Sequence, residues 1–200
     1  MPTAVEIPPP TQKKLYTVED LLAMPDDGVD RWLIRGQLRE RKDPEMTRRN
    51  RFHAALTSRI SQLIGNWLDK QPEPRGEVYD GEVGVYLRRN PDSAAGIDVV
   101  YAPPGVVASQ TDNTTMIDGI PTLVVEILSP SNTIEEVTEK TVDYLAAGVP
   151  LVWVVHPRFQ TVTVYRPNQP PEMFNTTHTL NCDPHMPGFS VPVIRLFKRG

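Results

Sequence analysis

The spacing of apolar residues in the first seventy positions predicts two helices with a strand between them. A short helix is expected from Thr17, because Thr17-Val-Glu-Asp20 resembles a capping box, and Pro25-Asp-Asp-Gly28 ends it. A strand is expected from Arg31 to Arg39. The clearest amphipathic helix is expected from Thr47 to Asp69, where apolar side chains recur every three to four residues: Phe52, Leu56, Ile60, Leu63, Ile64 and Trp67.

Beyond position 76, short apolar runs typical of strands replace the helical spacing. One further helix is predicted from Thr133 to Ala147, ending at Gly148 as a C′ glycine, with an apolar stripe that includes Ile134, Val137 and Tyr144. This order of elements predicts one mixed α/β layer fold, with a central mixed sheet flanked by helices, an extra N-terminal helix and strand, and a C-terminal β extension. The expected strands are Glu77–Leu87, Ile97–Ala102, Pro121–Leu128, Leu151–Val155 and Thr161–Tyr165.

Length and composition fit one globular domain. The chain has 200 residues, of which 39% are hydrophobic and 23% charged. Residues 1–14 are rich in proline and are expected to be a disordered tail, so that 15–200 form a single domain. The single cysteine, Cys182, excludes a disulfide framework within the chain. The sequence shows no secretory signal and no apolar run of membrane-spanning length, and we expect a cytoplasmic protein without membrane contact.

Charge is distributed unevenly along the chain. The formal net charge is -4, but the segment from Arg31 to Arg59 holds nine basic and three acidic residues, which makes it +6 and leaves -10 for the remainder. Such a segment either forms a local surface that receives a polyanion or is a solvated helix face. Charge alone does not separate these alternatives.

Glu126 is the most informative residue. It lies in Leu123-Val-Val-Glu-Ile-Leu128, whose two faces are both apolar, as in a buried central strand. An ionised carboxylate is costly there unless it is paired, metal-bound or protonated. The alternatives are therefore a carboxylate that pairs with an arginine at the end of the strand and a functional carboxylate, and the second is favoured.

Asp98 and Lys140 are further candidates for functional residues. Asp98 begins the expected strand before Glu126 and is either a turn or cap residue or, if the two strands are neighbours, a second carboxylate at the same end of the sheet. Two carboxylates with room for waters suit Mg²⁺ or Mn²⁺. Lys140 flanks the apolar stripe of its helix, where it either reaches the sheet or stays exposed and pairs with Glu136.

Taken together, an ordered set of motifs resembles the Uma family of restriction-endonuclease-like proteins, which belongs to the PD-(D/E)XK nuclease superfamily. The likeness spans nearly the whole chain. It is carried by Tyr16-Thr-Val-Glu-Asp-Leu-Leu22, the Asp98 strand, Val124-Val-Glu-Ile-Leu-Ser-Pro-Ser131, Glu139-Lys140, Tyr144-Leu-Ala-Ala-Gly148, Trp153-Val-Val-His-Pro157 and Pro187-Gly-Phe189.

The resemblance implies a site and a reaction. Asp98, Glu126 and the backbone carbonyl of Ile127 would hold a divalent metal, Mg²⁺ or Mn²⁺, for phosphodiester hydrolysis. The usual motif puts a lysine at position 128, which is Leu128 here, and Lys140 resembles a relocated lysine supplied from the next helix. The expected partner is DNA, and no organic cofactor is implied. Cutting both strands needs two sites, so a homodimer of the protein is possible. The expected nucleic-acid contacts are Arg48, Arg49, Arg51 and His53.

One departure from the family pattern leaves the function open. Acidic positions usual in the family are replaced by Trp32, Arg35 and Gln37. The first hypothesis is a metal-dependent endonuclease that acts on DNA. The alternatives are a catalytically silent nuclease fold that binds nucleic acid or protein, and a metal phosphodiesterase with small or RNA substrates.

Overall fold

A mixed β-sheet runs through the centre of the molecule in the computed structural model, which describes residues 14–41 and 51–198. The strands follow the order β2-β1-β4-β6-β7-β8-β9, while β3 pairs with β4 and β5. The bounds are β1 Asp30–Ile34, β2 Gln37–Arg41, β3 Glu77–Arg88, β4 Ser93–Ala102, β5 Ile117–Asp118, β6 Leu123–Ile127, β7 Leu151–His156, β8 Thr161–Tyr165 and β9 Glu172–Phe174.

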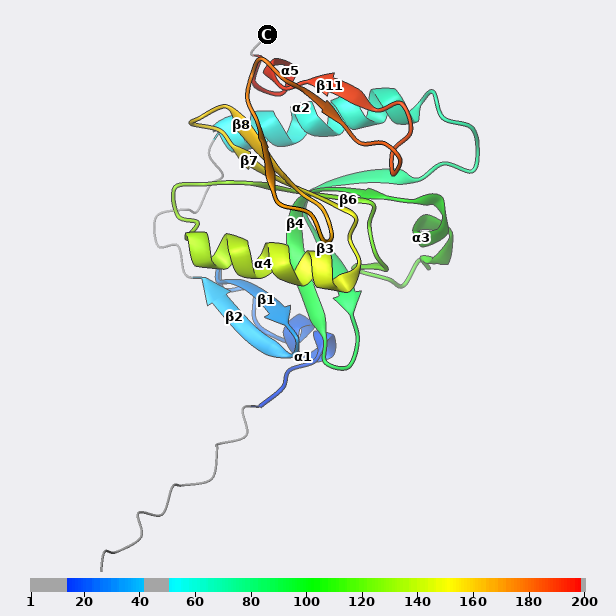
Figure 1. Cartoon of the computed structure of the whole chain (residues 1–200). Helices are drawn as coiled ribbons and strands as arrows, with labels where there is room; N and C mark the ends of the chain where they lie inside the picture. Colours follow the sequence, from blue (N-terminus) through cyan, green and yellow to red (C-terminus); the bar gives the residue numbers. More distant parts are fainter. Residues whose placement is uncertain (1–13, 42–50, 199–200) are drawn as a thin grey trace, which may run out of the picture.

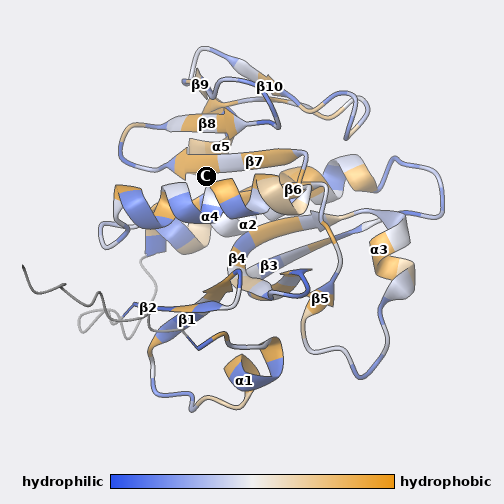
Figure 2. Ribbon diagram, turned by 60° about the horizontal axis from the view of Figure 1, so that its bottom comes forward, coloured by the Kyte–Doolittle hydropathy of each residue, from blue (hydrophilic) through white to orange (hydrophobic). Residues whose placement is uncertain are grey.

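Helices cover both faces of this sheet (Figure 1). The long helix α2 (Arg51–Leu68) packs on one face and α4 (Ile134–Ala147) on the other. Alternation along β6 explains the two layers, because Val125 points into the core under α2 and Val124 into the core beside α4. Figure 2 shows β6 and β7 coloured as hydrophobic, as expected for strands that are buried on both faces.

The remaining elements close the two ends of the sheet. Near the N-terminus, α1 (Val18–Leu22) lies against the β1–β2 hairpin, and α3 (Pro104–Ser109) precedes β5. At the C-terminus, β10 (Thr179–Asn181) and β11 (Ser190–Pro192) form a separate two-stranded sheet, followed by α5 (Ile194–Phe197). Buried side chains of this C-terminal part, such as Phe189 and Leu196, complete the core under α2.

Most of the predicted elements are confirmed. The helix α4 begins after a capping box, in which the side chains of Thr133 and Glu136 each accept a hydrogen bond from the other residue's backbone N–H. Its C-cap residue is Gly148, with a φ of 105°. Strand β8 has the predicted bounds, and the capping box at Thr17 is present. The mixed α/β fold class is therefore correct.

Several boundaries predicted from the sequence are wrong. The single strand expected from Arg31 to Arg39 is a hairpin, with Ile34 paired to Gln37 across the turn. The first helix ends at Leu22, before Pro25. Asp98 lies within β4, which begins five residues earlier at Ser93, so it is not a strand-start residue. Residues 1–13 and 42–50 lie outside the described residues, so the structure does not test the expected tail or the helix start at Thr47.

Candidate active site

The pairing between β4 and β6 stops next to two carboxylates, Asp98 and Glu126, which line one pocket. The antiparallel register pairs Tyr101 with Leu123, Val100 with Val124 and Val99 with Val125. The register ends there, and Asp98 and Glu126 are the next residues along the two strands. The side chain of Asp98 continues the connection, because its Oδ2 accepts a 2.7 Å hydrogen bond from the backbone N–H of Ile127.

The position of these carboxylates follows from the elements that carry them. Asp98 lies on the long, buried β4, with only 6% of its surface exposed, and Glu126 lies on the central β6. A pocket opens at this point and is lined by side chains from both halves of the chain. Its lining residues are Asp30, Arg41, His53, Glu82, Gly96, Asp98, Glu126, Ile127, Ser129, Asn132 and Lys140.

The α4 helix supports Glu126 through two side chains one turn apart. The ammonium of Lys140 lies 3.4 Å from Glu126 Oε1, and the Tyr144 hydroxyl donates a 2.5 Å hydrogen bond to the same oxygen. Lys140 also lies over the ring of Trp32, with Nζ 5.2 Å from the ring centroid. Lys140 therefore reaches the sheet and does not pair with Glu136, whose side chain caps the helix.

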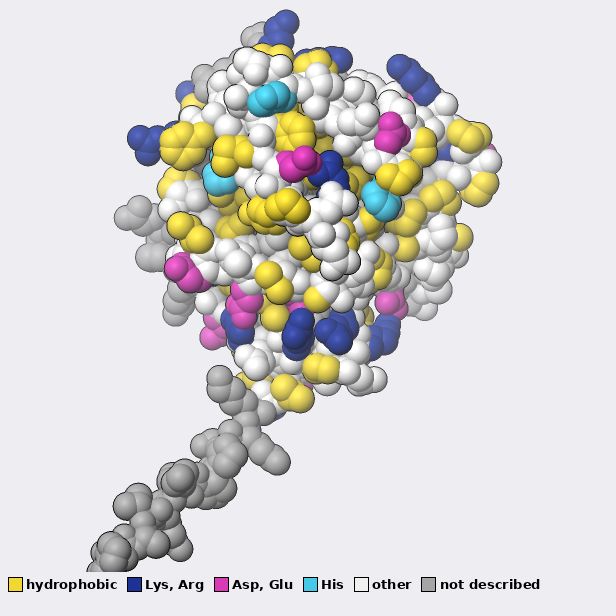
Figure 3. Space-filling model, viewed as in Figure 1, with side chains coloured by type: hydrophobic (Ala, Val, Ile, Leu, Met, Phe, Trp, Pro, Cys, Tyr) yellow, Lys and Arg dark blue, Asp and Glu magenta, His cyan; other side chains and the backbone are white. Residues whose placement is uncertain are grey.

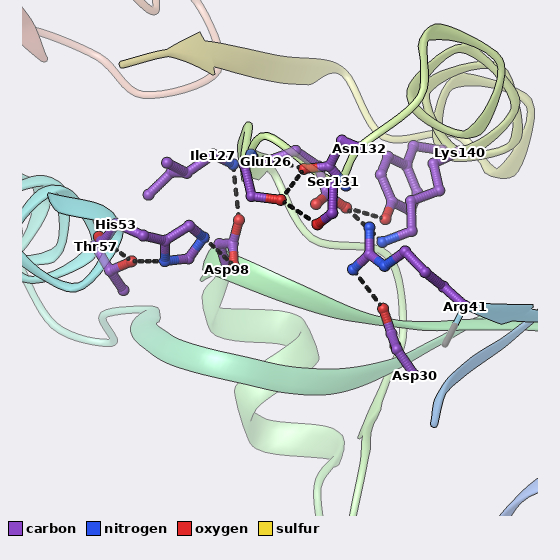
Figure 4. A network of polar contacts seen from close by, with 12 residues as sticks. Asp30, Arg41, His53, Thr57, Asp98, Glu126, Ile127, Ser131, Asn132 and Lys140 are labelled. Carbon is purple, nitrogen blue, oxygen red and sulfur yellow. Dashed lines mark hydrogen bonds and ion pairs between the residues drawn. The ribbon is translucent and has the colours of Figure 1, made fainter. Parts of the chain in front are cut away.

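The α2 helix supports Asp98 from the opposite side. His53 Nε2 lies 3.1 Å from Asp98 Oδ1, and His53 Nδ1 lies 3.4 Å from the Thr57 hydroxyl (Figure 4). The Thr57 hydroxyl donates to the His53 carbonyl one turn earlier. Asp98 is thus held by a backbone amide of β6 and by an imidazole of α2.

Burial dominates the electrostatics of Glu126. It raises the pKa of the Glu126 carboxyl, the Lys140 ammonium opposes this shift, and the negative charge of Asp98 adds to it. The pKa of Tyr144 is raised well above its usual value by burial and by the adjacent Glu126. Tyr144 therefore stays protonated at neutral pH and remains a hydrogen-bond donor.

The oxygen atoms present suit a hard divalent cation. Within residues 14–41 and 51–198, no three His, Cys, Asp or Glu side chains gather as a metal cluster. The carboxylate oxygens of Asp98 and Glu126 line the pocket. Such a set fits Mg²⁺, which keeps several waters and binds through one or two carboxylates.

The four residues predicted to contact nucleic acid do not lie together in the structure. Arg48 and Arg49 lie outside the described residues. Arg51 is exposed at the start of α2 and its guanidinium lies 4.7 Å from the Phe52 ring centroid, outside the pocket lining. His53 is in the pocket, but its contact is with Asp98.

Much of the basic charge on the hairpin is paired with acidic residues. Arg31 pairs with Asp27 and Glu40, whereas Arg35 pairs with Asp143 and Arg39 with Glu139, both on α4. Figure 3 shows Lys and Arg side chains close to Asp and Glu side chains over this part of the molecule. These ion pairs join the β1–β2 hairpin to α4 and to the segment that precedes β1.

Comparison with known families identifies the family of the chain. Residues 18–194 match the Uma2 family model, which is described as "Putative restriction endonuclease". The chain belongs to the Uma2 family. The resemblance predicted from the sequence motifs is thereby confirmed, and the match extends from α1 to α5.

Among solved structures, this Uma2 chain is similar to one described as a "putative nuclease belonging to DUF820 from Anabaena variabilis ATCC 29413". The TM-score is 0.75 at 20% sequence identity, and the match covers 90% of this chain and 97% of the other. A likeness at this identity shows a shared fold. No curated protein matches the chain. None of the described helices has the length and apolarity needed to cross a membrane.

Tyr144 and Arg41 are among the site residues that the sequence did not reveal. Tyr144 was placed in the apolar stripe of its helix, although its position one turn after Lys140 puts both residues on one face. Arg41 was counted only as part of the basic segment. No local signal separates it from Arg39, because its place in the pocket depends on the hairpin.

Proposed function

We propose that this protein is a metal-dependent endonuclease that hydrolyses DNA phosphodiester bonds in the pocket at the end of the β4–β6 ladder. The observation that carries the proposal is that Asp98 and Glu126 line one pocket, with the Lys140 ammonium 3.4 Å from Glu126. The nuclease description of the family and the shared fold support it.

The metal would be Mg²⁺ or Mn²⁺, held by Asp98, Glu126 and the backbone carbonyl of Ile127. When bound, it supplies Lewis-acid chemistry, which lowers the pKa of water and offsets the negative charge that builds on the phosphoryl group. The protein's own contribution is to hold two carboxylates in place before the ion arrives. The Ile127 amide and His53 fix Asp98, and Tyr144 fixes Glu126.

Lys140 has the role of orienting the attacking water and screening charge on the phosphate. Its ammonium lies over the Trp32 ring and its side chain is 14% exposed, so the ammonium is held at the pocket with limited access to solvent. A fixed cation in a partly dry site acts more strongly on developing charge than a solvated one. Lys140 takes the place of the lysine that position 128 lacks.

The proposal is tested with purified protein and supercoiled plasmid. In Mg²⁺ or Mn²⁺ the protein is expected to nick the plasmid, and excess EDTA is expected to stop it. Asp98→Asn and Glu126→Gln are each expected to abolish nicking while circular dichroism stays unchanged. Glu172→Gln is a matched control, because Glu172 pairs with Arg166 away from the pocket. Nicking by Glu126→Gln at the rate of the unsubstituted protein would overturn the mechanism.

A silent nuclease fold that binds nucleic acid is the second candidate. It is favoured by the three positions at which the family usually has acidic residues and this chain has Trp32, Arg35 and Gln37. Here the Lys140 ammonium lies over the Trp32 ring, Arg35 pairs with Asp143, and the Gln37 side chain accepts a hydrogen bond from Arg39. None of these side chains adds a carboxylate to the site. Plasmid that is retarded in a gel but left uncut in both metals would select this alternative.

A further inference from the structure

Arg41 extends from the end of β2 into the pocket that contains the two carboxylates. It lines this pocket together with Lys140, although the two residues come from different elements. Figure 4 shows its side chain directed from β2 toward the part of the network that holds Lys140. Arg41 is also 20% exposed, so its guanidinium is reachable from the pocket.

The neighbours of Arg41 fix its position without using all of its donors. Its Nη2 donates a 2.7 Å hydrogen bond to Asp30 Oδ2, which lies directly across the β1–β2 ladder. Its Nη1 lies 3.8 Å from Glu136 Oε2, which is beyond hydrogen-bond distance. A guanidinium carries five N–H donors, so within residues 14–41 and 51–198 several remain for another acceptor.

Arg39 differs in this respect, although it lies two residues earlier on the same strand. Both its Nε and its Nη2 donate to the Glu139 carboxylate on α4, so its fork is already occupied by an acid. Arg39 does not line the pocket. Both arginines therefore lie beside carboxylates, but only the side chain of Arg41 lines the pocket.

The charge balance of the pocket shows what Arg41 is suited to bind. Four carboxylates line the pocket, from Asp30, Glu82, Asp98 and Glu126. Among the described residues, Arg41 and Lys140 supply the lysine and arginine charge of the lining, and Lys140 is already at Glu126. A guanidinium at this position can hold a phosphate group that enters the pocket.

We propose that Arg41 is a substrate-binding residue that donates to a non-bridging phosphate oxygen of the strand being cut. This inference rests on the proposed function. A planar guanidinium held on one side by a carboxylate can present two parallel N–H groups to a phosphate on the other. Asp30 and Glu136 orient the fork, and Arg41 contacts the substrate.

The test compares Arg41→Ala with Arg39→Ala. Binding of a fluorescein-labelled DNA oligonucleotide is measured by anisotropy at several NaCl concentrations in Mg²⁺, with Glu126→Gln in the background to prevent turnover. Arg41→Ala is expected to weaken binding about tenfold to a hundredfold and to lower the salt slope by about one. Arg39→Ala is expected to leave both quantities nearly unchanged, although it also loses an ion pair to α4.

Arg41→Lys keeps the charge and guards against a folding defect in the alanine variant. It is expected to keep the salt slope and to lose part of the affinity, because an ammonium cannot form the two-pronged contact. Equal affinity and slope in Arg41→Ala and Arg39→Ala, in proteins with the same melting temperature, would overturn the assignment of Arg41 alone. Absence of both binding and cutting in the unsubstituted protein would overturn the proposed function as well.

Discussion

The hydroxyl of Tyr144 donates a 2.5 Å hydrogen bond to Oε1 of Glu126. The donor is buried on α4 and the acceptor lies on the central strand β6, so the bond joins a helix to the sheet at the candidate site. The Lys140 ammonium lies near the same oxygen. Both supports of Glu126 therefore act on one oxygen of the carboxylate, which fixes the direction in which the other oxygen points.

Tyr144→Phe is expected to weaken Mn²⁺ binding about tenfold or more while the fold persists. The ring still fills its place in the core, but the carboxylate loses the donor that orients it. Isothermal titration with Mn²⁺ measures the effect. Tyr101→Phe is the control, because Tyr101 is a buried tyrosine of the core under α2. Equal Mn²⁺ affinity in both variants would show that Tyr144 serves packing alone.

Asp92→Asn is expected to destabilise the protein by about 2 kcal/mol at pH 7. Burial works to raise the pKa of Asp92, but hydrogen bonds from Tyr86 and from the amides of Val18 and Asn90 outweigh it and leave the pKa lowered. A lowered pKa in the folded state means that ionised Asp92 stabilises the fold above the unfolded value of about 4, and that this contribution is lost as the pH falls through the folded value.

Urea denaturation of both proteins at pH 7 and pH 3 tests this expectation. The difference in free energy of unfolding should shrink at the lower pH. Asp69→Asn is a suitable control, since the Asp69 side chain is 81% exposed and lies 3.8 Å from the Arg75 guanidinium. If the difference in free energy of unfolding between the wild type and Asp92→Asn were larger at pH 3 than at pH 7, the lowered pKa of Asp92 would be contradicted.

Two glycine substitutions should differ in their effect on the free energy of unfolding. Gly148→Ala is expected to cost about 1 to 2 kcal/mol, because its φ of 105° is strained for a residue with a Cβ. Gly65→Ala is expected to be neutral or to stabilise by up to about 1 kcal/mol, since it lies within α2 and an added Cβ meets nothing within 4 Å. Denaturant unfolding of both variants measures this contrast, and a stabilising Gly148→Ala would argue against the left-handed helix end.

The thiol of Cys182 should be unreactive in the native protein. It is 1% exposed, and burial raises its pKa to about 12, so the reactive thiolate is scarce at pH 8. A colorimetric disulfide reagent is expected to modify it only after unfolding in guanidinium chloride. Rapid stoichiometric modification of the native protein would contradict the buried position.

The sequence predicted best those elements whose ends carry their own signals. Helix α4 has a capping box at Thr133 and a left-handed glycine at its end, and β7 and β8 are short apolar runs between turn residues. Glu126 was recognisable because a carboxylate among apolar neighbours is unusual on either face of a strand. Those features depend on local sequence alone.

The errors arose where distant contacts decide the structure. The β1–β2 turn uses Arg35 and Gly36, both with positive φ, although Arg-Gly is not among the common hairpin pairs. The start of β4 was missed because Ala94, Ala95 and Gly96 lack the bulky side chains that mark strands. Ile134, placed in the apolar stripe of α4, is 81% exposed.

An indole stands at position 32, where the family usually has an acid, and the ammonium of Lys140 lies above it. An aromatic face attracts a cation without bringing a formal charge of its own. The neighbourhood of Lys140 thus carries one negative charge fewer than it would with a carboxylate at this position. Under the proposed function, the indole would therefore let a phosphate chain approach Lys140 with less repulsion than a carboxylate at this position.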